Sequence, residues 1–254
     1  MQLDLLPAFA DNYIWILRDD AGHALVVDPG DAAPVLAAAD QGLQPVAVLL
    51  THHHADHIGG AAAIRRRWPS IPVFAAPDDR IGLECRRLDD GEEFGVGSWR
   101  FSSMAVPGHT VSHIAVHGHG HLFCGDTLFS LGCGRMFEGT PAQMLASLDR
   151  LAALPGETAV CCGHEYTLAN AAFARTVDPE NAALRRHAEE AQAMQEQSRP
   201  TLPSTIARER AGNPFLRVDA PAVRAAVAAR LGREPVDRVE TFAELRRWKD
   251  GFGG

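Results

Sequence analysis

Apolar and polar positions divide the chain into a first part rich in strands and a second part rich in helices. Short apolar runs predict strands at residues 12–17 and 24–28, and the unbroken apolar run at 45–50 predicts a strand buried on both faces. Helical patterns at 33–42 and 59–68 lie on either side of that run, the first closed by glycine and the second stopped by proline. The first third therefore alternates strand and helix, as layered α/β folds do.

The pattern changes in the middle of the chain. Apolar runs joined by tight turns predict antiparallel strands at 98–106, 112–118 and 121–126, followed by a helix at 141–154 and a strand at 157–163. From about residue 168 onward no strand is expected. The helices predicted there span 168–177, 179–197, 220–231 and 241–250. We therefore predict a β-containing domain at residues 1–167 and a helical domain at 168–254.

Composition limits the classes of protein that fit this pattern. A chain of 254 residues with 46% hydrophobic composition can form one large core, or a large and a small domain. It contains no apolar run of about 18 residues, so no membrane span is expected, and the N-terminus reads as mature protein. The net charge of −8 argues against a nucleic-acid partner. Five cysteines, an odd number without framework spacing, favour the reducing cytoplasm.

The stretch "THHHADHIGG" directly follows the buried strand and concentrates metal-binding side chains. His52, His54, Asp56 and His57 have the spacing H-x-H-x-D-H. Imidazole and carboxylate are the usual ligands of zinc and similar divalent ions. In an extended segment His52 and His54 share one side, and a turn would direct Asp56 and His57 to a second ion. These four ligands are too few for two coordination spheres, so the others must come from distant segments.

Three further candidates each follow a strand-like run and a glycine. They are His109 in "VPGHT", Asp126 in "FCGDT" and His164 in "CCGHE". Any one of them alone would be an ordinary residue at a strand end. Together with the histidine motif they give five histidines and two aspartates, which are enough for two ions if one carboxylate bridges them. The sequence therefore predicts a two-metal centre.

The other polar residues near these motifs have different predicted roles. His53 is expected to be structural, and His113 to lie beside a ligand. Three histidines at 117–121 alternate with glycine and predict an exposed hairpin turn. His187 is expected on a solvated helix face, and Asp28 either orients a ligand histidine or caps its strand.

The quoted motifs, followed by "GDTLF" and "CGHEYT" in this order, resemble the metallo-β-lactamase superfamily. With "GCGRMFEGT", "NPFLR" and "RRWKD", they resemble glyoxalase II, the hydroxyacylglutathione hydrolase family. The resemblance implies an α/β (α+β) fold, a four-layer αββα sandwich followed by a C-terminal helical domain that binds glutathione. It assigns His52, His54 and His109 to one metal. It assigns Asp56, His57 and His164 to the other, with Asp126 bridging.

The same resemblance implies a reaction. The chain would hydrolyse the thioester S-D-lactoylglutathione to D-lactate and glutathione, the second step of methylglyoxal detoxification. The cofactors would be two divalent ions, Zn²⁺ or alternatively Fe or Mn, which lower the pKa of a shared water to about 7. Asp56 and Asp126 would act in catalysis, and no serine or cysteine nucleophile is required. The expected partner is this small molecule alone, and the expected state is a monomer.

The family binds glutathione through residues that match Arg135, Tyr166, Arg246 and Lys249 here. Arginine stands at 135 where lysine is common, and Phe137 stands where tyrosine is common. Lys249 is the one lysine of the chain. Being three positions apart, Arg246 and Lys249 would share a helix face and clamp a carboxylate. A solvated basic helix end is the alternative.

Other functions of this superfamily remain as alternatives. A β-lactamase or lactonase would use the same metal motif, although a secreted β-lactamase is expected to carry an export signal. A persulfide dioxygenase with one iron is expected to lack the extended "RRWKD" end. A nuclease is disfavoured by the acidic charge, and a metal-stabilised binding protein by the intact ligand set and substrate clamp.

Overall fold

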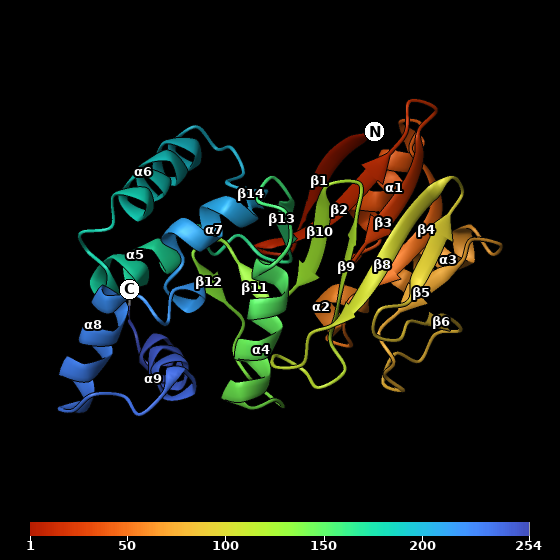
Figure 1. Cartoon of the computed structure of the whole chain (residues 1–254). Helices are drawn as coiled ribbons and strands as arrows, with labels where there is room; N and C mark the ends of the chain where they lie inside the picture. The colour runs from red at the N-terminus through yellow and green to blue at the C-terminus, as the bar shows by residue number, and fades with distance from the viewer. Residues whose placement is uncertain (254) are drawn as a thin grey trace. The chain divides into compact units, whose positions relative to one another are not determined.

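The computed structural model describes residues 1–253, which fall into two compact units (Figure 1). The first unit comprises Met1–Ala105 and Ser112–Gly125, and the second comprises Val106–Val111 and Asp126–Gly254. The domain boundary after residue 167 stays a prediction, because these units follow spatial contacts and not independently folding segments. No helix within residues 1–253 is long and apolar enough to cross a membrane.

The first unit contains a six-stranded sheet with antiparallel and parallel parts. In spatial order its strands are β1 (Gln2–Ala8), β2 (Asn12–Arg18), β3 (His23–Val27), β4 (Gln44–Leu50), β5 (Val73–Ala75) and β6 (Arg86–Arg87). β1 to β3 pair antiparallel, and β3 to β6 pair parallel. Val48, Leu49 and Leu50 of β4 are fully buried between two parallel partners. The predicted doubly buried strand is therefore confirmed.

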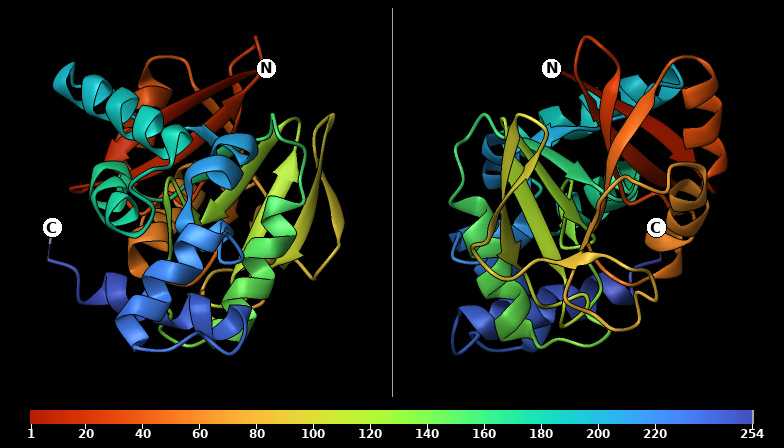
Figure 2. Two further views of the ribbon diagram at one scale, coloured as in Figure 1. Left: turned by 60° about the vertical axis from the view of Figure 1, so that its left-hand side comes forward. Right: turned by 90° about the vertical axis from the view of Figure 1, so that its right-hand side faces the viewer.

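Four antiparallel strands form the second β layer of the first unit. They are β7 (Glu93–Val96), β8 (Trp99–Ala105), β9 (Ile114–Gly118) and β10 (His121–Gly125). Helices α1 (Ala33–Asp40) and α3 (Ala61–Arg67) cover the face of the first sheet that points away from the second β layer (Figure 2). His119 and Gly120 both have positive φ, 52° and 78°, which is the backbone of a tight hairpin turn. The predicted turn at the alternating histidines is thus confirmed.

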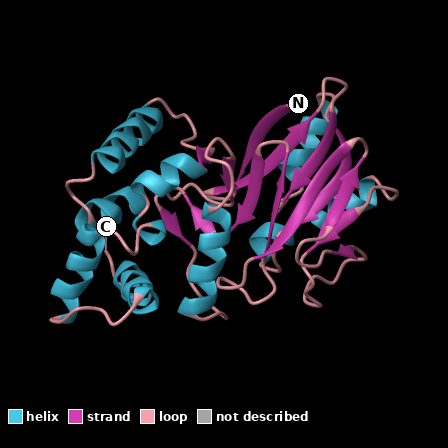
Figure 3. Ribbon diagram, viewed as in Figure 1, coloured by secondary structure: helices cyan, strands magenta, loops and turns pink. Residues whose placement is uncertain are grey.

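Helices predominate in the second unit (Figure 3). They are α4 (Pro141–Ala152), α5 (Thr167–Val177), α6 (Ala182–Glu196), α7 (Ile206–Gly212), the 3₁₀ helix η1 (Pro214–Leu216), α8 (Pro221–Leu231) and α9 (Arg238–Asp250). Two short strand pairs accompany them. These are β11 (Leu128–Phe129) with β12 (Gly132–Cys133), and β13 (Ala159–Cys162) with β14 (Ser204–Thr205). Polar side chains start several helices, as in the capping box of Thr140 and Gln143 on α4.

The core of the second unit is aromatic. Phe173 on α5 lies 5.9 Å from Phe215 and 5.5 Å from Trp248, measured between ring centroids. Phe215 in turn contacts Phe242 on α9. These large side chains join α5, η1 and α9 and therefore fix the end of α9, which carries Arg246 and Lys249, two of the four predicted substrate residues.

Two sequence expectations need correction. A strand, β14, does occur after residue 168: its two residues, Ser204 and Thr205, are too few to give a period-2 signal and are held by pairing with β13. His187 is buried, not solvated. Its Nε2 atom lies 3.2 Å from Ser130 Oγ, and burial lowers the pKa of His187 to about 4. The 15-residue helix α6 is amphipathic, and His187 falls on its inner face with Leu184 and Ala188.

Candidate metal centre

The histidine motif begins where two neighbouring parallel strands end. Asp28 follows β3 with φ of 50°, and its carboxylate accepts hydrogen bonds from Thr51 N at 2.8 Å and Thr51 Oγ1 at 2.7 Å. Thr51 directly follows β4. Because β3 and β4 are parallel, their carboxyl ends meet, and Asp28 fixes the start of the loop that holds the histidines.

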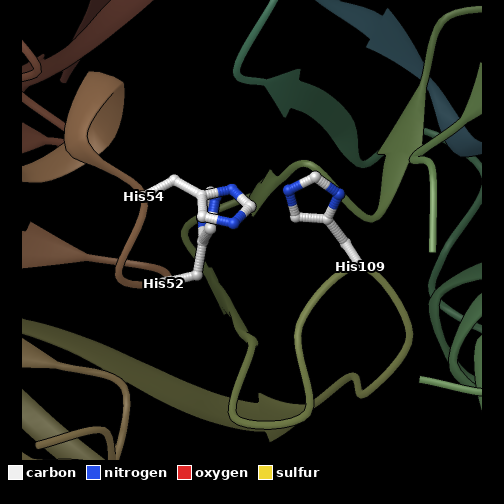
Figure 4. A group of neighbouring side chains, drawn as sticks. All are labelled: His52, His54 and His109. Atoms are coloured by element: carbon white, nitrogen blue, oxygen red, sulfur yellow. The ribbon is translucent and has the colours of Figure 1, made fainter. Parts of the chain in front are cut away.

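Four potential ligands then lie close together in the first unit. His52 and His57 are buried, with ring centroids 4.2 Å apart, and the ring of His54 lies 4.7 Å from that of His52 (Figure 4). Asp56 and His57 belong to the one-turn helix α2 (Ala55–Ile58). A Cβ atom at Gly30 would lie 1.8 Å from the carbonyl oxygen of Asp56, so this turn can pack only against glycine. The clustering predicted from the spacing is present.

The hydrogen bonds of these histidines define which nitrogen faces a metal. His57 Nδ1 lies 3.1 Å from Asp28 Oδ2, and a carboxylate can only accept, so Nδ1 carries the proton. His52 Nδ1 lies 3.1 Å from Thr51 Oγ1, whose own hydrogen is donated to Asp28. Both imidazoles therefore offer Nε2 as the ligand atom, which is the arrangement of carboxylate–histidine–metal sites.

The sequence did not predict the role of Asn12. Its Nδ2 atom donates to Asp56 Oδ2 at 3.0 Å and to the Asp56 carbonyl at 3.3 Å. This contact orients one oxygen of the Asp56 carboxylate. Asn12 begins β2, 44 positions before Asp56, and no local signal in the sequence connects the two residues.

Two neighbouring histidines take the supporting places expected of them. The ring of His53 packs against that of His54, with centroids 4.7 Å apart, and its Nδ1 atom lies 3.3 Å from Asp78 Oδ2. His113 stacks on His52 with ring centroids 4.5 Å apart, and its Nδ1 lies 3.0 Å from the Ile114 carbonyl. Both side chains thus restrict the rotation of the rings beside them.

The second unit brings together the other three predicted ligands. The Nε2 atoms of His109 and His164 lie 3.4 Å and 3.3 Å from the same oxygen, Oδ2 of buried Asp126. His109 Nδ1 lies 2.8 Å from the Arg135 carbonyl, which can only accept. His109 therefore also offers Nε2. A Cβ atom at Gly134 would lie 1.9 Å from the Asp126 carbonyl, so glycine is required beside this carboxylate.

These donors fit divalent metal ions. The set consists of carboxylates and of imidazoles, all buried except the half-buried His54, and these donors suit Zn, Fe and Mn. One potential ligand group lies within the first unit and comprises Asp28, His52 and His57. The other potential ligand groups are His52, His54 and His109 (Figure 4), and Asp56, His57 and His164. The centre is thus a His- and Asp-rich divalent metal site.

The predicted substrate residues all lie in the second unit. Tyr166 stacks on the ligand His164, with ring centroids 4.8 Å apart and an interplanar angle of 6°. Arg135 is exposed, and its Nε lies 3.3 Å from Asp250 Oδ1. Arg246 is only 5% exposed and donates from Nη1 to the Cys133 carbonyl at 2.7 Å.

The side chain of Lys249 contacts α5. Its Nζ donates to the Ala169 carbonyl at 2.9 Å and lies 5.6 Å from the centre of the Phe173 ring. Burial, followed by the nearby charge of Arg246, lowers the pKa of Lys249. The two residues share a helix face as the spacing predicted, but they do not contact a common partner in the structure. Phe137 is 62% exposed, with its ring 5.3 Å from that of His109.

Family models match almost the whole chain. The model described as "Metallo-beta-lactamase superfamily" matches residues 9–164, so the chain is a member of this superfamily of metal-dependent proteins. The model described as "Hydroxyacylglutathione hydrolase C-terminus" matches residues 165–252. The chain belongs to the hydroxyacylglutathione hydrolase family.

Individual relatives agree with this classification. A hydroxyacylglutathione hydrolase of Xanthomonas euvesicatoria pv. vesicatoria (strain 85-10) is 60% identical over 253 residues, which cover 99% of each chain. The crystal structure of ETHE1 from Myxococcus xanthus is similar with a TM-score of 0.65 and 26% identity, covering 99% of this chain and 91% of that one. TTHA1623, solved in a di-iron-bound form, has a TM-score of 0.55 and 30% identity, covering 65% and 92%. The predicted metallo-β-lactamase fold with a helical C-terminal region is confirmed.

Proposed function

We propose that this chain hydrolyses S-D-lactoylglutathione to D-lactate and glutathione, the second step of methylglyoxal detoxification. The observation that carries the proposal is the similarity at 60% identity, along 99% of the chain, to a protein named hydroxyacylglutathione hydrolase. The structure adds a chemical reason. The same unit presents ligands for a metal and, stacked directly on one of them, the half-exposed phenol of Tyr166.

The proposed cofactors are two divalent ions, Zn²⁺ or alternatively Fe or Mn. His52, His54 and His109 would hold one ion, and Asp56, His57 and His164 the other, with Asp126 bridging. The support comes from these ligand groups and from the position of the Asp126 oxygen between two imidazole nitrogens. When bound, the two ions would supply a hydroxide nucleophile at neutral pH and polarise the thioester carbonyl.

The chain itself would position both the ligands and the substrate. Asp28 keeps the proton of His57 on Nδ1, and Asn12 holds one oxygen of Asp56. The departing thiol of glutathione has a pKa of about 8.5 and leaves as a thiolate without a protein acid.

Cationic side chains of the second unit would recognise the two carboxylates of glutathione. Arg135 is the most exposed of them, and guanidinium groups bind carboxylates through paired hydrogen bonds. Lys249 and Tyr166 would add further contacts to glutathione, and the buried Arg246 would support them. Phe137 offers an apolar face in place of a hydroxyl, so recognition depends more on the charged residues.

We place the enzyme in the cytoplasm as a monomer. The support for the cytoplasm comes from the cysteines. Burial raises the pKa of Cys133 to about 11 and also raises the pKa of Cys161, so these thiols are unreactive packing residues of the kind found in reducing compartments. Size-exclusion chromatography with light scattering tests the monomer.

The decisive experiment compares two thioesters and measures bound metal on the same sample. One substrate is S-D-lactoylglutathione, and the other is a lactoyl thioester that lacks both glutathione carboxylates. Rapid hydrolysis of the first, slow hydrolysis of the second and about two ions per chain are expected. Inactivity toward both with the metals bound would contradict the proposal, and lactone, β-lactam and persulfide substrates would then be tested.

A further inference from the structure

Two arginine side chains of the second unit meet on a single carboxylate oxygen. Asp250 Oδ1 lies 3.3 Å from Arg135 Nε and 3.1 Å from Arg246 Nη2. Asp250 is the last residue of α9, where a negative charge is unfavourable for the helix dipole. The two arginines offset this cost, so the carboxylate and the guanidinium groups form one linked arrangement.

Arg246 is the buried anchor of this arrangement. Its side chain is 6% exposed, Nη1 donates to the Cys133 carbonyl, and the guanidinium lies 5.3 Å from the centre of the Phe215 ring. A guanidinium enclosed in this way offers little surface to a ligand. Its contacts instead fix the position of Asp250 relative to β12.

Arg135 is the exposed end of the same arrangement. Its side chain is 58% exposed, and it contacts Asp250 through Nε. That contact leaves the edge formed by Nη1 and Nη2 available for a second carboxylate. A guanidinium binds a carboxylate best through two parallel hydrogen bonds from one edge.

We propose that Asp250 is a positioning residue for substrate binding. It holds Arg135 by Nε, with Arg246 as its own support, so that the Nη1–Nη2 edge of Arg135 is presented to a carboxylate of the glutathione moiety. The inference rests on the proposed function for the identity of the ligand. It assigns to Asp250 a role in affinity and none in the chemical step.

The first test substitutes Asp250→Asn and measures both thioesters. For S-D-lactoylglutathione the KM is expected to rise about fivefold, the effect of losing one exposed ion pair, with kcat within about twofold. The KM of the thioester without glutathione carboxylates should not change. Asp219→Asn is the matched control: Asp219 also pairs with an arginine Nε, that of Arg238 at 3.1 Å, and its removal should leave both KM values unchanged.

The second test asks whether Asp250 acts through Arg135. Arg135→Ala should raise KM, and Asp250→Asn added to Arg135→Ala should raise it no further. Asp250→Glu, which keeps a carboxylate, should recover part of the affinity. If Asp250→Asn raises KM by the same factor in the wild type and in Arg135→Ala, Asp250 has a general structural role and the proposal is overturned. A lower KM in Asp250→Asn would also overturn it, because Asp250 would then compete with the substrate.

A binding measurement separates this inference from the proposed function. The dissociation constant of S-methylglutathione is measured by calorimetry for the wild type and Asp250→Asn. If the wild type hydrolyses neither thioester but binds S-methylglutathione more tightly than Asp250→Asn does, the proposed function fails and the positioning role stands. Equal binding by both proteins would overturn the positioning role, whatever the activity.

Discussion

Asp28 Oδ2 lies 3.1 Å from His57 Nδ1 and 2.7 Å from Thr51 Oγ1, although 29 positions separate Asp28 from the histidine. One carboxylate thus sets the proton position of His57 directly and that of His52 through the threonine hydroxyl. Asp28 is buried and supplies no hydrogen, so its charge is balanced by hydrogen bonds from Thr51 and from the predicted ligand His57. The metal-binding loop is therefore oriented by a residue at the end of the neighbouring strand.

Asp28→Asn should lower the affinity for metal about 10- to 100-fold. The amide cannot accept from all three donors, and the histidine rings lose their fixed orientation. The affinity is measured by competition with a chromophoric chelator. Asp78→Asn serves as the control, because Asp78 faces His53, which is not a predicted ligand. Unchanged affinity in Asp28→Asn would show that Asp28 only caps its strand.

Asp126→Asn should abolish hydrolysis and reduce the metal content from about two ions per chain to about one. The neutral amide lacks the second anionic oxygen that a bridge between two ions requires, and the imidazoles of His109 and His164 lose the carboxylate between them. Initial rates and metal analysis on the same sample check this outcome. Full activity in this variant would contradict the two-metal mechanism.

Much of the fold was predictable because its signals are local. The doubly buried strand β4 reads as an unbroken apolar run, and α4 begins at a capping box. β1 was missed: it is an edge strand whose side chains are mostly half-buried and which contains Pro7, so its period is weak. Short strands such as β14 depend on a partner that the local sequence does not reveal.

In the site, too, residues with a local signal were predicted, and residues that depend on distant contacts were not. The ligands were predicted because metal chemistry restricts residue type and because four of them are neighbours in the chain. Their supports were not predicted, since Asn12 meets Asp56 from 44 positions away and Arg246 meets Cys133 from 113 positions away. Helical spacing placed Arg246 and Lys249 on one face, but burial and neighbouring carbonyls determine where each side chain points.

Lys249→Ala should raise the KM for S-D-lactoylglutathione several-fold and leave kcat nearly unchanged. Lys249 is half-buried beside Phe173, and its amino group would bind a carboxylate of the substrate. Arg247→Ala removes a cation two positions away that pairs with Glu244, and it should leave the KM unchanged. If both variants raise the KM equally, the effect is a general loss of positive charge and Lys249 has no specific contact.

A buried carboxylate supports the turn between β11 and β12. Glu209 is fully buried and accepts hydrogen bonds from Leu131 N at 2.7 Å, from Asn213 Nδ2 at 3.0 Å and from the Ser204 hydroxyl. Burial outweighs these hydrogen bonds and raises the pKa of Glu209 from 4.5 to about 7. The turn follows the predicted ligand Asp126. Because Glu209 loses its proton near pH 7, the stability of this region changes with pH near neutrality.

The raised pKa of Glu209 makes the free energy of unfolding depend on pH. Between pH 4.5 and 7 the unfolded chain has lost the Glu209 proton while the folded chain keeps it, so this group makes the free energy of unfolding fall as the pH rises. Glu209→Gln removes the titration. The free energy of unfolding of the variant minus that of the wild type should therefore rise across this window, by up to about 3 kcal/mol. Urea unfolding at several pH values from 5 to 8 measures it.

Glu240→Gln provides the control for this titration. Its hydrogen bonds with Arg233 lower the pKa of the exposed Glu240 to about 2, so Glu240 is ionised in both the folded and the unfolded chain above about pH 5. The difference in free energy of unfolding between Glu240→Gln and the wild type should be constant from pH 5 to 8. A constant difference for Glu209→Gln as well would mean that the three donors keep Glu209 ionised, and that its carboxylate holds the turn at every pH in this range.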